Sequence, residues 1–314
     1  MKISICTLFE KDYHNSVGVL FNSLYNKGFR GIFWVGYRGN LPTWATTYIS
    51  TKFYEEFQIA EDCVIRFVQL NTRYHLANYK PSFMLELLES LDSDADAIFY
   101  FDPDIVNKCD WSFYEKWVKC GIALCEGQYP DLSDNHPRRV VWQEFSKQKG
   151  FKLQRDISRF YDAGCVGFCT NRIDTIFTWK KLLDEGIKDD QIKLESSQNK
   201  EATSFVFRDD QCVLNLALML TKEPISAVGP HGMVFGKIGS LMSHAVRPIA
   251  KPWQRKYLME ALKRYPPRLA DKCYWKNTES PILVHKAKTS KEKKLILKFS
   301  SFIASFFKRS IVIN

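Results

Sequence analysis

The stretch AIFYFDPDIVNKCDW, Ala97–Trp111, runs from apolar and aromatic residues directly into two aspartates, Asp102 and Asp104, with one proline between them. A short, uninterrupted apolar run is typical of a strand that is buried on both faces of a sheet. Pro103 holds the residue before it in extended backbone, where side chains two positions apart point to the same side. Two like charges this close repel each other unless a cation lies between them. The stretch therefore predicts a cation site at the end of a buried strand.

Two carboxylates on one side of the chain suit a divalent metal ion. Mg²⁺ and Mn²⁺ prefer oxygen ligands and are often bound jointly by protein carboxylates and by the phosphate oxygens of a ligand. A solvated Asp-Pro-Asp turn is the alternative interpretation. The buried strand directly before Asp102 favours the metal site.

Strand-like and helix-like segments alternate along most of the chain. Buried strands are expected at 2–9, 30–39, 63–70, 97–101, 121–127 and 161–170. Helices are expected at 15–29, with Gly28 as the C-cap, at 80–91, with Pro81 in the first turn, at 172–185 and at 209–220. This alternation predicts an α/β fold with a mostly parallel sheet flanked by helices, in which ligands bind beyond the carboxyl ends of the strands.

The last part of the chain has a different pattern. From Trp253 onward it is helical, so we expect a ligand-binding and catalytic domain at 1–255 and a helical extension at 256–314. In the tail, Leu, Ile and Phe alternate with Lys at helical spacing, which is typical of a helix lying in the surface of an anionic membrane. A helix that packs on the protein's own core, with its lysines in water, is the alternative.

The formal charge of +10 is concentrated in that tail. Residues 286–314 contain eight Lys or Arg and one Glu, so they carry +7 and leave +3 for the rest of the chain. A nucleic-acid-binding domain usually carries its cations along a folded face, interleaved with aromatic or hydroxyl residues. We therefore expect no nucleic-acid partner.

The cysteines and the apolar runs bear on where the protein is found. The nine cysteines form no CxxC pair, and the first apolar run, Ile3–Phe9, is too short for a secretory signal. No apolar run reaches the roughly 18–20 residues that a membrane span requires. Reduced thiols are expected. The expected location is cytoplasmic, peripheral on the inner face of a membrane.

Several segments together resemble one enzyme family. An Asp-x-Asp motif after an apolar strand resembles the nucleotide-sugar glycosyltransferases of the GT-A fold, a Rossmann-like α/β fold. Further segments resemble the retaining family that includes glycogenin and bacterial galactosyltransferases, and they occur in the same order as in that family. These segments are NYKPSFMLELL (78–88), YDAGCVGF (161–168, like FNAGVLL), DDQCVLNLAL (209–218, like DQxxLN) and SHAVRPIAKPW (243–253, like HxxGxxKPW).

The resemblance implies a function and a set of site residues. The implied function is a metal-dependent hexosyl transfer, with retention of configuration, from a nucleotide diphosphate sugar such as a UDP-sugar to a glycan or lipid-linked acceptor. The implied metal is Mn²⁺ or Mg²⁺. The implied metal ligands are Asp102, Asp104 and His244; the implied donor-binding residues are Thr7, Leu8, Phe9, Tyr13, Lys80, Asp102 and Lys251; and the implied catalytic residues are Asp162, Asp210 and Gln211.

Two departures from the family pattern point to a neighbouring family. His244 lies one residue farther from Lys251-Pro252-Trp253 than the family spacing, and Arg247 replaces the glycine. His285 is therefore the second candidate for the third metal ligand, because it also follows a short apolar run.

Each of the other site residues also has a structural interpretation. Asp210 can be a helix N-cap, and Asp162 can simply pair with a neighbouring cation. Lys80 can belong to the first turn of its helix, and Lys251 with Arg247 can form a solvated basic loop. For His244 the alternative is a hydrogen bond to the backbone.

Three other functions were considered. The segment GMVFGK, 232–237, has too few residues between its glycines for a phosphate-binding loop, which argues against a nucleoside triphosphatase. A nucleotidyltransferase uses a similar sheet and metal but generally has a glycine-rich basic loop after the first strand, where this chain has TLFEKDYHNS. A catalytically inactive, membrane-docked binding protein is the non-enzymatic alternative.

Overall fold

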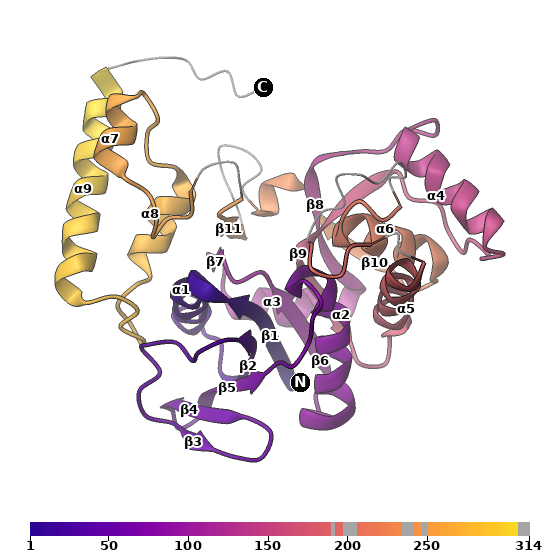
Figure 1. The fold of residues 1–314 in the computed structure, drawn as a ribbon, viewed down its shortest axis with the longest axis horizontal. Helices are drawn as coiled ribbons and strands as arrows, with labels where there is room; N and C mark the ends of the chain where they lie inside the picture. Colours follow the sequence, from indigo (N-terminus) through magenta and orange to yellow (C-terminus); the bar gives the residue numbers. More distant parts are fainter. Residues whose placement is uncertain (190–191, 197–205, 234–240, 247–249, 307–314) are drawn as a thin grey trace.

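A computed structural model describes residues 1–189, 192–196, 206–233, 241–246 and 250–306 of the chain (Figure 1). Its centre is a nine-stranded sheet. In spatial order the strands are β10 (Ile225–Val228), β8 (Ile122–Asp131), β9 (Arg159–Cys169), β6 (Ala97–Phe101), β1 (Ile3–Glu10), β2 (Gly31–Arg38), β5 (Cys63–Gln69), β4 (Glu55–Ala60) and β3 (Ile49–Ser50). The fold is α/β, as the sequence predicts.

The sheet is mixed, and the expectation of a mostly parallel sheet is wrong. The central strands β6, β1, β2 and β5 are parallel, and β10 is parallel to β8. Strand β9 is antiparallel to both of its neighbours, β6 and β8. Strand β4 is antiparallel to β5, because the two residues that join them are too few for a crossover connection.

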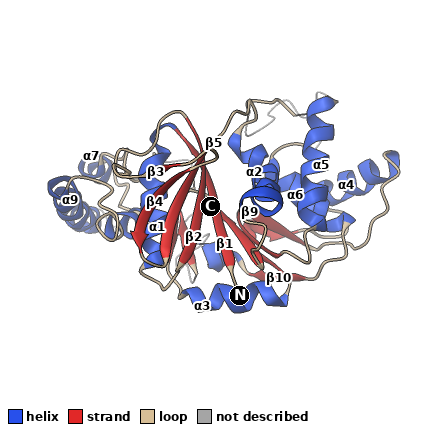
Figure 2. Cartoon of the chain, turned by 90° about the horizontal axis from the view of Figure 1, so that it is seen from below, coloured by secondary structure: helices blue, strands red, loops and turns tan. Residues whose placement is uncertain are grey.

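Helices cover both faces of this sheet (Figure 2). The first group is α1 (His14–Tyr25), α3 (Trp111–Trp117) and the C-terminal helices α7 (Tyr257–Leu262), α8 (Leu269–Lys276) and α9 (Ala287–Phe306). The second group is α2 (Leu76–Glu86), α4 (Pro137–Gln148), α5 (Asp174–Lys188) and α6 (Asp210–Leu220). A π-helical turn, Leu87–Leu91, extends α2, and short 3-10 helices lie at Lys11–Tyr13, Val118–Cys120 and Pro230–Met233.

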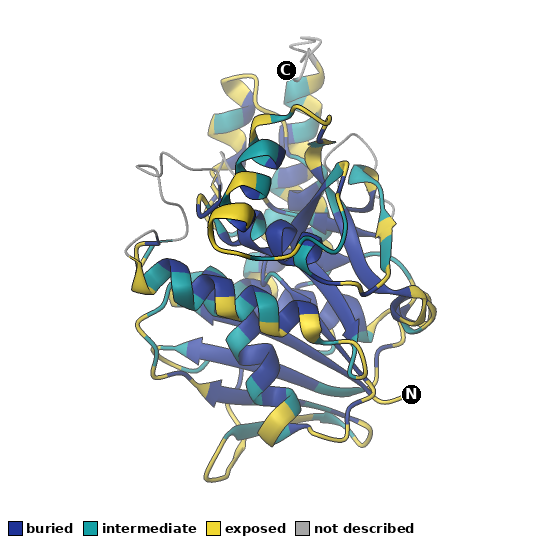
Figure 3. Cartoon of the chain, turned by 90° about the vertical axis from the view of Figure 1, so that its right-hand side faces the viewer, coloured by how far each residue is buried: buried dark blue, intermediate teal, exposed yellow. Residues whose placement is uncertain are grey.

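Side chains of the strands alternate between two hydrophobic cores. In β1, Ile3, Ile5 and Phe9 pack with the first group of helices, whereas Cys6 and Leu8 pack with the second. Because both faces are covered, most of the strands are buried along their length, as the dark blue strands in Figure 3 show. This explains the nearly continuous apolar runs in the sequence.

The ends of the helices differ from expectation at two places. Helix α1 ends at Tyr25, before the predicted residue 29, and Gly28 lies in the turn that follows with a φ of +91°. Helix α2 begins at Leu76, so Pro81 lies inside the helix and the expectation that it occupies the first turn is wrong. The earlier start is capped by His75, whose side chain accepts a hydrogen bond from the backbone N–H of Ala77.

The C-terminal helices share a hydrophobic core with the sheet. Trp275 of α8 and Leu297 of α9 belong to the same buried cluster as Leu20 of α1. The side chain of Asn22 donates to the backbone carbonyls of Asn277 and Ile282, at 2.8 Å each. The division of the chain at residue 255 stays a prediction, and this packing ties the two parts closely together.

Candidate metal and nucleotide-binding site

A short second sheet brings a distant histidine to the two aspartates. Strand β7 (Ile105–Asn107) follows the Asp-Pro-Asp motif directly and pairs antiparallel with β11 (Met242–His244), so that His244 lies opposite Ile105. The backbone N–H of Ala245 donates to the carbonyl of Asp104 at 3.1 Å. The pairing therefore carries the imidazole to the end of β6, where the two carboxylates lie.

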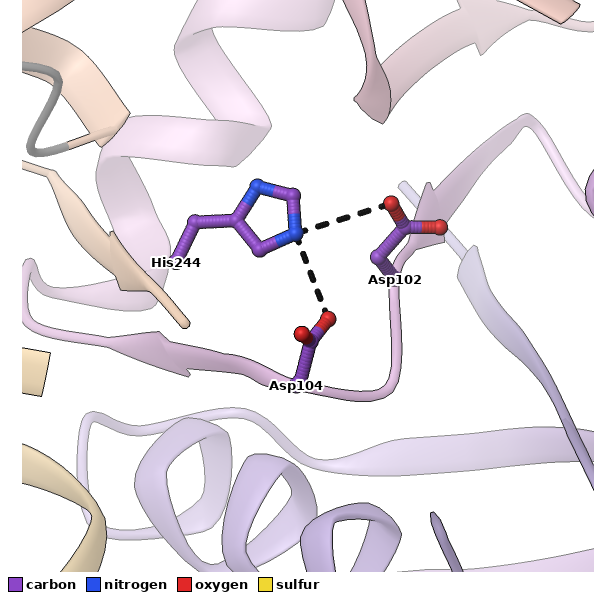
Figure 4. A group of neighbouring side chains, drawn as sticks. All are labelled: Asp102, Asp104 and His244. Atoms are coloured by element: carbon purple, nitrogen blue, oxygen red, sulfur yellow. Dashed lines mark ion pairs between the residues drawn. The ribbon is translucent and has the colours of Figure 1, made fainter. Parts of the chain in front are cut away.

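Asp102, Asp104 and His244 point toward one another (Figure 4). Nε2 of His244 is 3.2 Å from Oδ1 of Asp104 and 3.7 Å from Oδ2 of Asp102. One ligand atom from each residue lies within 4.8 Å of the others, close enough for the three to hold a metal ion together. Two carboxylates and an imidazole form a donor set that suits Mn²⁺.

His285, the second candidate ligand, does not belong to this group. Its Nε2 is hydrogen-bonded to the hydroxyl of Tyr274 at 2.8 Å, and its ring lies 5.0 Å from that of Trp275. Burial lowers the pKa of His285 to about 4, so the ring is neutral at physiological pH. Its surroundings are those of a packed aromatic cluster.

The side chains of His244 and Lys251 face the carboxylate of Asp104, which is only 7% exposed. One oxygen faces His244, and the other accepts from Nζ of Lys251, which also donates to the carbonyl of Ala245 at 2.7 Å. Burial alone would raise the pKa of Asp104, but His244 and Lys251 hold it well below its usual value. Burial likewise opposes the charged form of His244, yet Asp104 and Asp102 raise its pKa above the usual value.

A second lysine, Lys80 of α2, connects the aspartates to helix α6. Its buried Nζ lies 2.8 Å from Oδ2 of Asp210 and 3.0 Å from Oδ1 of Asp102, and it donates to the carbonyl of Ala163 at 3.1 Å. Burial by itself lowers the pKa of this amine, but the two carboxylates more than offset that effect. The hydroxyl of Tyr100 donates to the same oxygen of Asp102 at 3.0 Å.

Asp210 is not the N-cap of its helix. The N-cap is Asp209, whose side chain accepts from the backbone N–H of Cys212 at 2.9 Å. The neighbouring carboxylate of Asp210 is therefore available to pair with Lys80. Burial raises the pKa of Asp210 to about 6, although the nearby amine opposes the shift.

Asp162 and Gln211 lie near Lys80 and Asp210 and also belong to the site. The carboxylate of Asp162 accepts from the backbone N–H of Gly164 at 2.7 Å, and burial raises its pKa. The side-chain oxygen of Gln211 accepts from the backbone N–H of Ala163 at 3.4 Å. The segments of β9 and α6 that carry the family resemblance thus lie next to each other.

A cavity of about 500 Å³ opens over these groups. Of the residues that the sequence predicts for the site, it is lined by Leu8, Phe9, Tyr13, Lys80, Asp102, Asp104, Asp162, Asp210, Gln211, His244 and Lys251. Thr7 does not line it, because its side chain is buried within the sheet. Arg247 lies outside the described residues, as do Lys237 and most of the segment 191–204.

Glu10, Lys11 and His75 are among the lining residues that sequence reasoning missed. Glu10 is the last residue of β1, and its carboxylate pairs with Arg38 at 2.8 Å. Since Glu10 and Lys11 directly follow the predicted first strand, their position beyond its carboxyl end was the available signal. His75 gave none, because histidine is an uncommon N-cap.

The Lys-Pro-Trp segment closes the cavity against the chain that follows β1. The indole N–H of Trp253 donates to Oδ2 of Asp12 at 2.7 Å, and the side chain of Gln254 donates to the same oxygen at 2.6 Å. The ring of Trp253 also meets that of Tyr13 edge-on at 5.4 Å. These contacts hold Lys251 beside Asp104.

Gly164 gives a test of how tightly the site is packed. A Cβ at this position would lie 2.8 Å from Oδ1 of Asp162, 2.9 Å from Oδ2 of Asp102 and 3.0 Å from Cε1 of His244. Since these atoms are the ends of side chains, we expect Gly164→Ala to keep the fold but to lower the affinity for Mn²⁺ about tenfold to a hundredfold. Calorimetric titration with Mn²⁺ measures this.

Gly127→Ala is the matched control, because its Cβ would meet Cδ1 of Phe160 at 3.0 Å. Gly127 also lies in a strand of the sheet but does not line the cavity. Equal Mn²⁺ affinities of the two variants would contradict the placement of the metal between Asp102 and His244.

The two histidines can be separated in the same titration. We expect His244→Ala to weaken Mn²⁺ binding by about tenfold or more, because one of three protein ligands is lost. His285→Ala should leave the affinity unchanged, although it removes a hydrogen bond to Tyr274. If only the His285 variant lost affinity for Mn²⁺, the third metal ligand would be His285 and not His244.

Comparison with protein-family models gave no match, and comparison with curated protein sequences gave none either. Among the described residues, no helix combines the length and the apolarity needed to cross a membrane.

Proposed function

We propose that this protein is a metal-dependent glycosyltransferase of the GT-A fold that transfers a sugar from a nucleotide diphosphate sugar to a glycan or lipid-linked acceptor. The observation that carries the proposal is the group of Asp102, Asp104 and His244 at the carboxyl end of a central strand, inside a cavity that Lys80 and Lys251 also line. A divalent metal with nearby cations matches the negative charge of a diphosphate.

The roles of the residues follow from their positions. Asp102, Asp104 and His244 would hold Mn²⁺ or Mg²⁺, which supplies Lewis-acid stabilisation of the leaving nucleoside diphosphate when it is bound. Lys251, held beside Asp104, adds a positive charge to the same region. Lys80 fixes the positions of Asp102 and Asp210 through its two ion pairs.

Three residues beyond the metal group are proposed to act on the sugar. Glycosyl transfer passes through an oxocarbenium-like state, which nearby carboxylates stabilise. Asp162 and Asp210 line the cavity with Gln211 and are buried, so their charges act in a medium of low polarity. Retention of configuration is proposed from the family resemblance alone.

The residues that line the cavity at and after the end of β1 are proposed to bind the nucleoside. They are Leu8, Phe9 and Tyr13. Aromatic and aliphatic side chains of this kind suit the face of a base. The residues after β1 form a short 3-10 helix, Lys11–Tyr13, and no glycine-rich loop, which disfavours a nucleotidyltransferase.

Hydrolysis of the donor tests the proposal. The purified protein is incubated with a panel of UDP-sugars and Mn²⁺, and release of UDP is measured with and without a chelator. We expect slow release from at least one donor, which stops when the chelator is added. Asp102→Asn should abolish release, while Glu61→Gln, an exposed carboxylate in the β4–β5 turn, should not. Release that is insensitive to both the chelator and Asp102→Asn would refute the function.

A further inference from the structure

Helix α9 packs on the protein through one face only. Leu297, Ser290 and Ser300 are buried, and Lys293 points inward with its Nζ 5.7 Å from the ring centroid of Tyr257 and 6.0 Å from that of Trp275. The alternative that the sequence left open, a helix packed on the protein's own core, is therefore correct for this face. Packing on the protein's own core does not explain the residues on the opposite face of α9.

The opposite face of α9 is exposed and carries large apolar side chains. Leu295, Phe299 and Phe302 lie at i, i+4 and i+7, which places them in one row along the helix, and each is more than half exposed. Isolated exposed apolar residues are ordinary on protein surfaces, but a row of large ones marks a contact surface.

Helix α7, which lies beside α9, also carries exposed apolar side chains. Leu258, Met259 and Leu262 are exposed by 40% to 64%, whereas Tyr257 and Ala261 of the same helix are buried. Figure 1 shows α7 beside the C-terminal half of α9, the half that carries Phe299 and Phe302, at one end of the long axis of the molecule. We call the exposed residues Leu258, Met259, Leu262, Leu295, Phe299 and Phe302 the end surface.

The charges around the end surface are positive. Lys288, Lys291 and Lys298 are exposed and continue the row of Leu295 and Phe302 at spacings of three and four residues. Residues 286–314 carry +7, with a single Glu among them. Lys256 and Lys263 flank the exposed face of α7.

We propose that the end surface docks on an anionic lipid bilayer, with α9 lying in the plane of the membrane and α7 beside it. Aromatic and aliphatic side chains would enter the boundary between headgroups and acyl chains, and the lysines would meet the acidic headgroups. A second protein chain would bury the apolar residues equally well, but it would not explain why nearly all charges of this tail have one sign. The positive charge of the tail therefore favours an anionic membrane over a second protein chain.

Sedimentation with lipid vesicles tests the proposal, with the full chain and without donor or metal. We expect wild-type protein to bind vesicles of phosphatidylglycerol and phosphatidylcholine more tightly than vesicles of phosphatidylcholine alone. Leu295→Ser/Phe299→Ser/Phe302→Ser should lower the partition coefficient by about tenfold or more, because the apolar contribution is lost. Lys288→Gln/Lys291→Gln/Lys298→Gln should remove the preference for the anionic lipid.

The control replaces exposed apolar residues elsewhere: Ile49→Ser/Phe53→Ser/Phe177→Ser. It should bind vesicles like the wild type. Equal losses in both serine variants, or no binding of wild type to the anionic vesicles, would overturn the proposal. A wild-type dimer that the α9 serine variant dissociates would do the same and would assign the end surface to a second copy. Because the assay contains no donor, its outcome is independent of the enzymatic proposal.

Discussion

Asp104→Asn is expected to lower metal-dependent transfer by at least about a thousandfold, because metal stabilisation of the leaving group contributes several kcal/mol and each ~1.4 kcal/mol is a factor of ten. The amide is nearly isosteric but carries no charge to hold the cation. Asp102→Asn should behave in the same way. Initial rates at saturating donor and a range of Mn²⁺ concentrations measure the effect, and normal Mn²⁺-dependent rates in both variants would refute the metal site.

The same substitution also affects stability, which the sequence alone did not indicate. Asp104 is buried and faces both Lys251 and His244, so Asp104→Asn leaves the cation of Lys251 without its closest counter-charge. We expect a loss of about 2–3 kcal/mol in the free energy of unfolding at pH 7, near the lower end for a broken buried ion pair. Because the pKa of Asp104 is held low, this contribution exists above the unfolded carboxyl pKa and is lost as pH falls through the folded one.

Lys80→Met is expected to be the most destabilising single change in the site, with a loss of about 3–5 kcal/mol at pH 7. The substitution keeps the length of the side chain but leaves the carboxylates of Asp102 and Asp210 in the same buried region without their shared cation. Urea unfolding followed by circular dichroism measures the loss. Transfer should also be abolished, since both carboxylates lose their anchor.

The pH dependence of this loss has a definite sign. Burial already raises the pKa of Asp210 to about 6, and without Lys80 it should rise further. A carboxyl pKa that is raised in the folded state costs the most stability above that pKa, and the cost shrinks as the pH falls from there towards the unfolded carboxyl pKa. The stability difference between Lys80→Met and wild type should therefore shrink from pH 7 to pH 5.

A double variant separates charge from packing. Lys80→Met/Asp210→Asn should recover a large part of the stability, because one of the two uncompensated carboxylates is gone. Asp210→Asn alone leaves Lys80 paired with Asp102 and closes the double-mutant cycle. If Lys80→Met were as stable as wild type at pH 7, or if the double variant recovered nothing, the ion pairs of Lys80 would not hold the site together.

Much of the fold could be predicted from local sequence, because buried strands and amphipathic helices carry their pattern within ten or twenty residues. The apolar run of β6 and the helix after Asp209 are examples. Strand direction carries no such pattern. The apolar run of β9 reads the same whether it is parallel or antiparallel to β6, so the mixed sheet could not be predicted.

Some residues of the candidate site could be predicted from the local sequence, and others could not. Asp102 and Asp104 follow from the strand before them, whereas His244 depends on a three-residue strand pairing with β7 far away along the chain. No local pattern specifies that pairing. The role of Asp210 was open between a helix N-cap and a site residue, and only the hydrogen bond from Cys212 to Asp209 shows that Asp209 is the cap. Thr7 was misplaced because it lies deeper in β1 than Leu8 and Phe9, which are nearer to the carboxyl end of the strand where the cavity opens.

Joint binding of metal and nucleotide tests the central claim most directly. UDP is titrated into the full-length protein by calorimetry, first in Mn²⁺ and then in a chelator, and the titrations are repeated with Asp102→Asn. The metal group and the lysines around it predict that Mn²⁺ tightens UDP binding by at least about tenfold in the wild type and not in the variant. Equal affinities with and without Mn²⁺, or no binding of UDP under either condition, would contradict a metal-dependent nucleotide-sugar site.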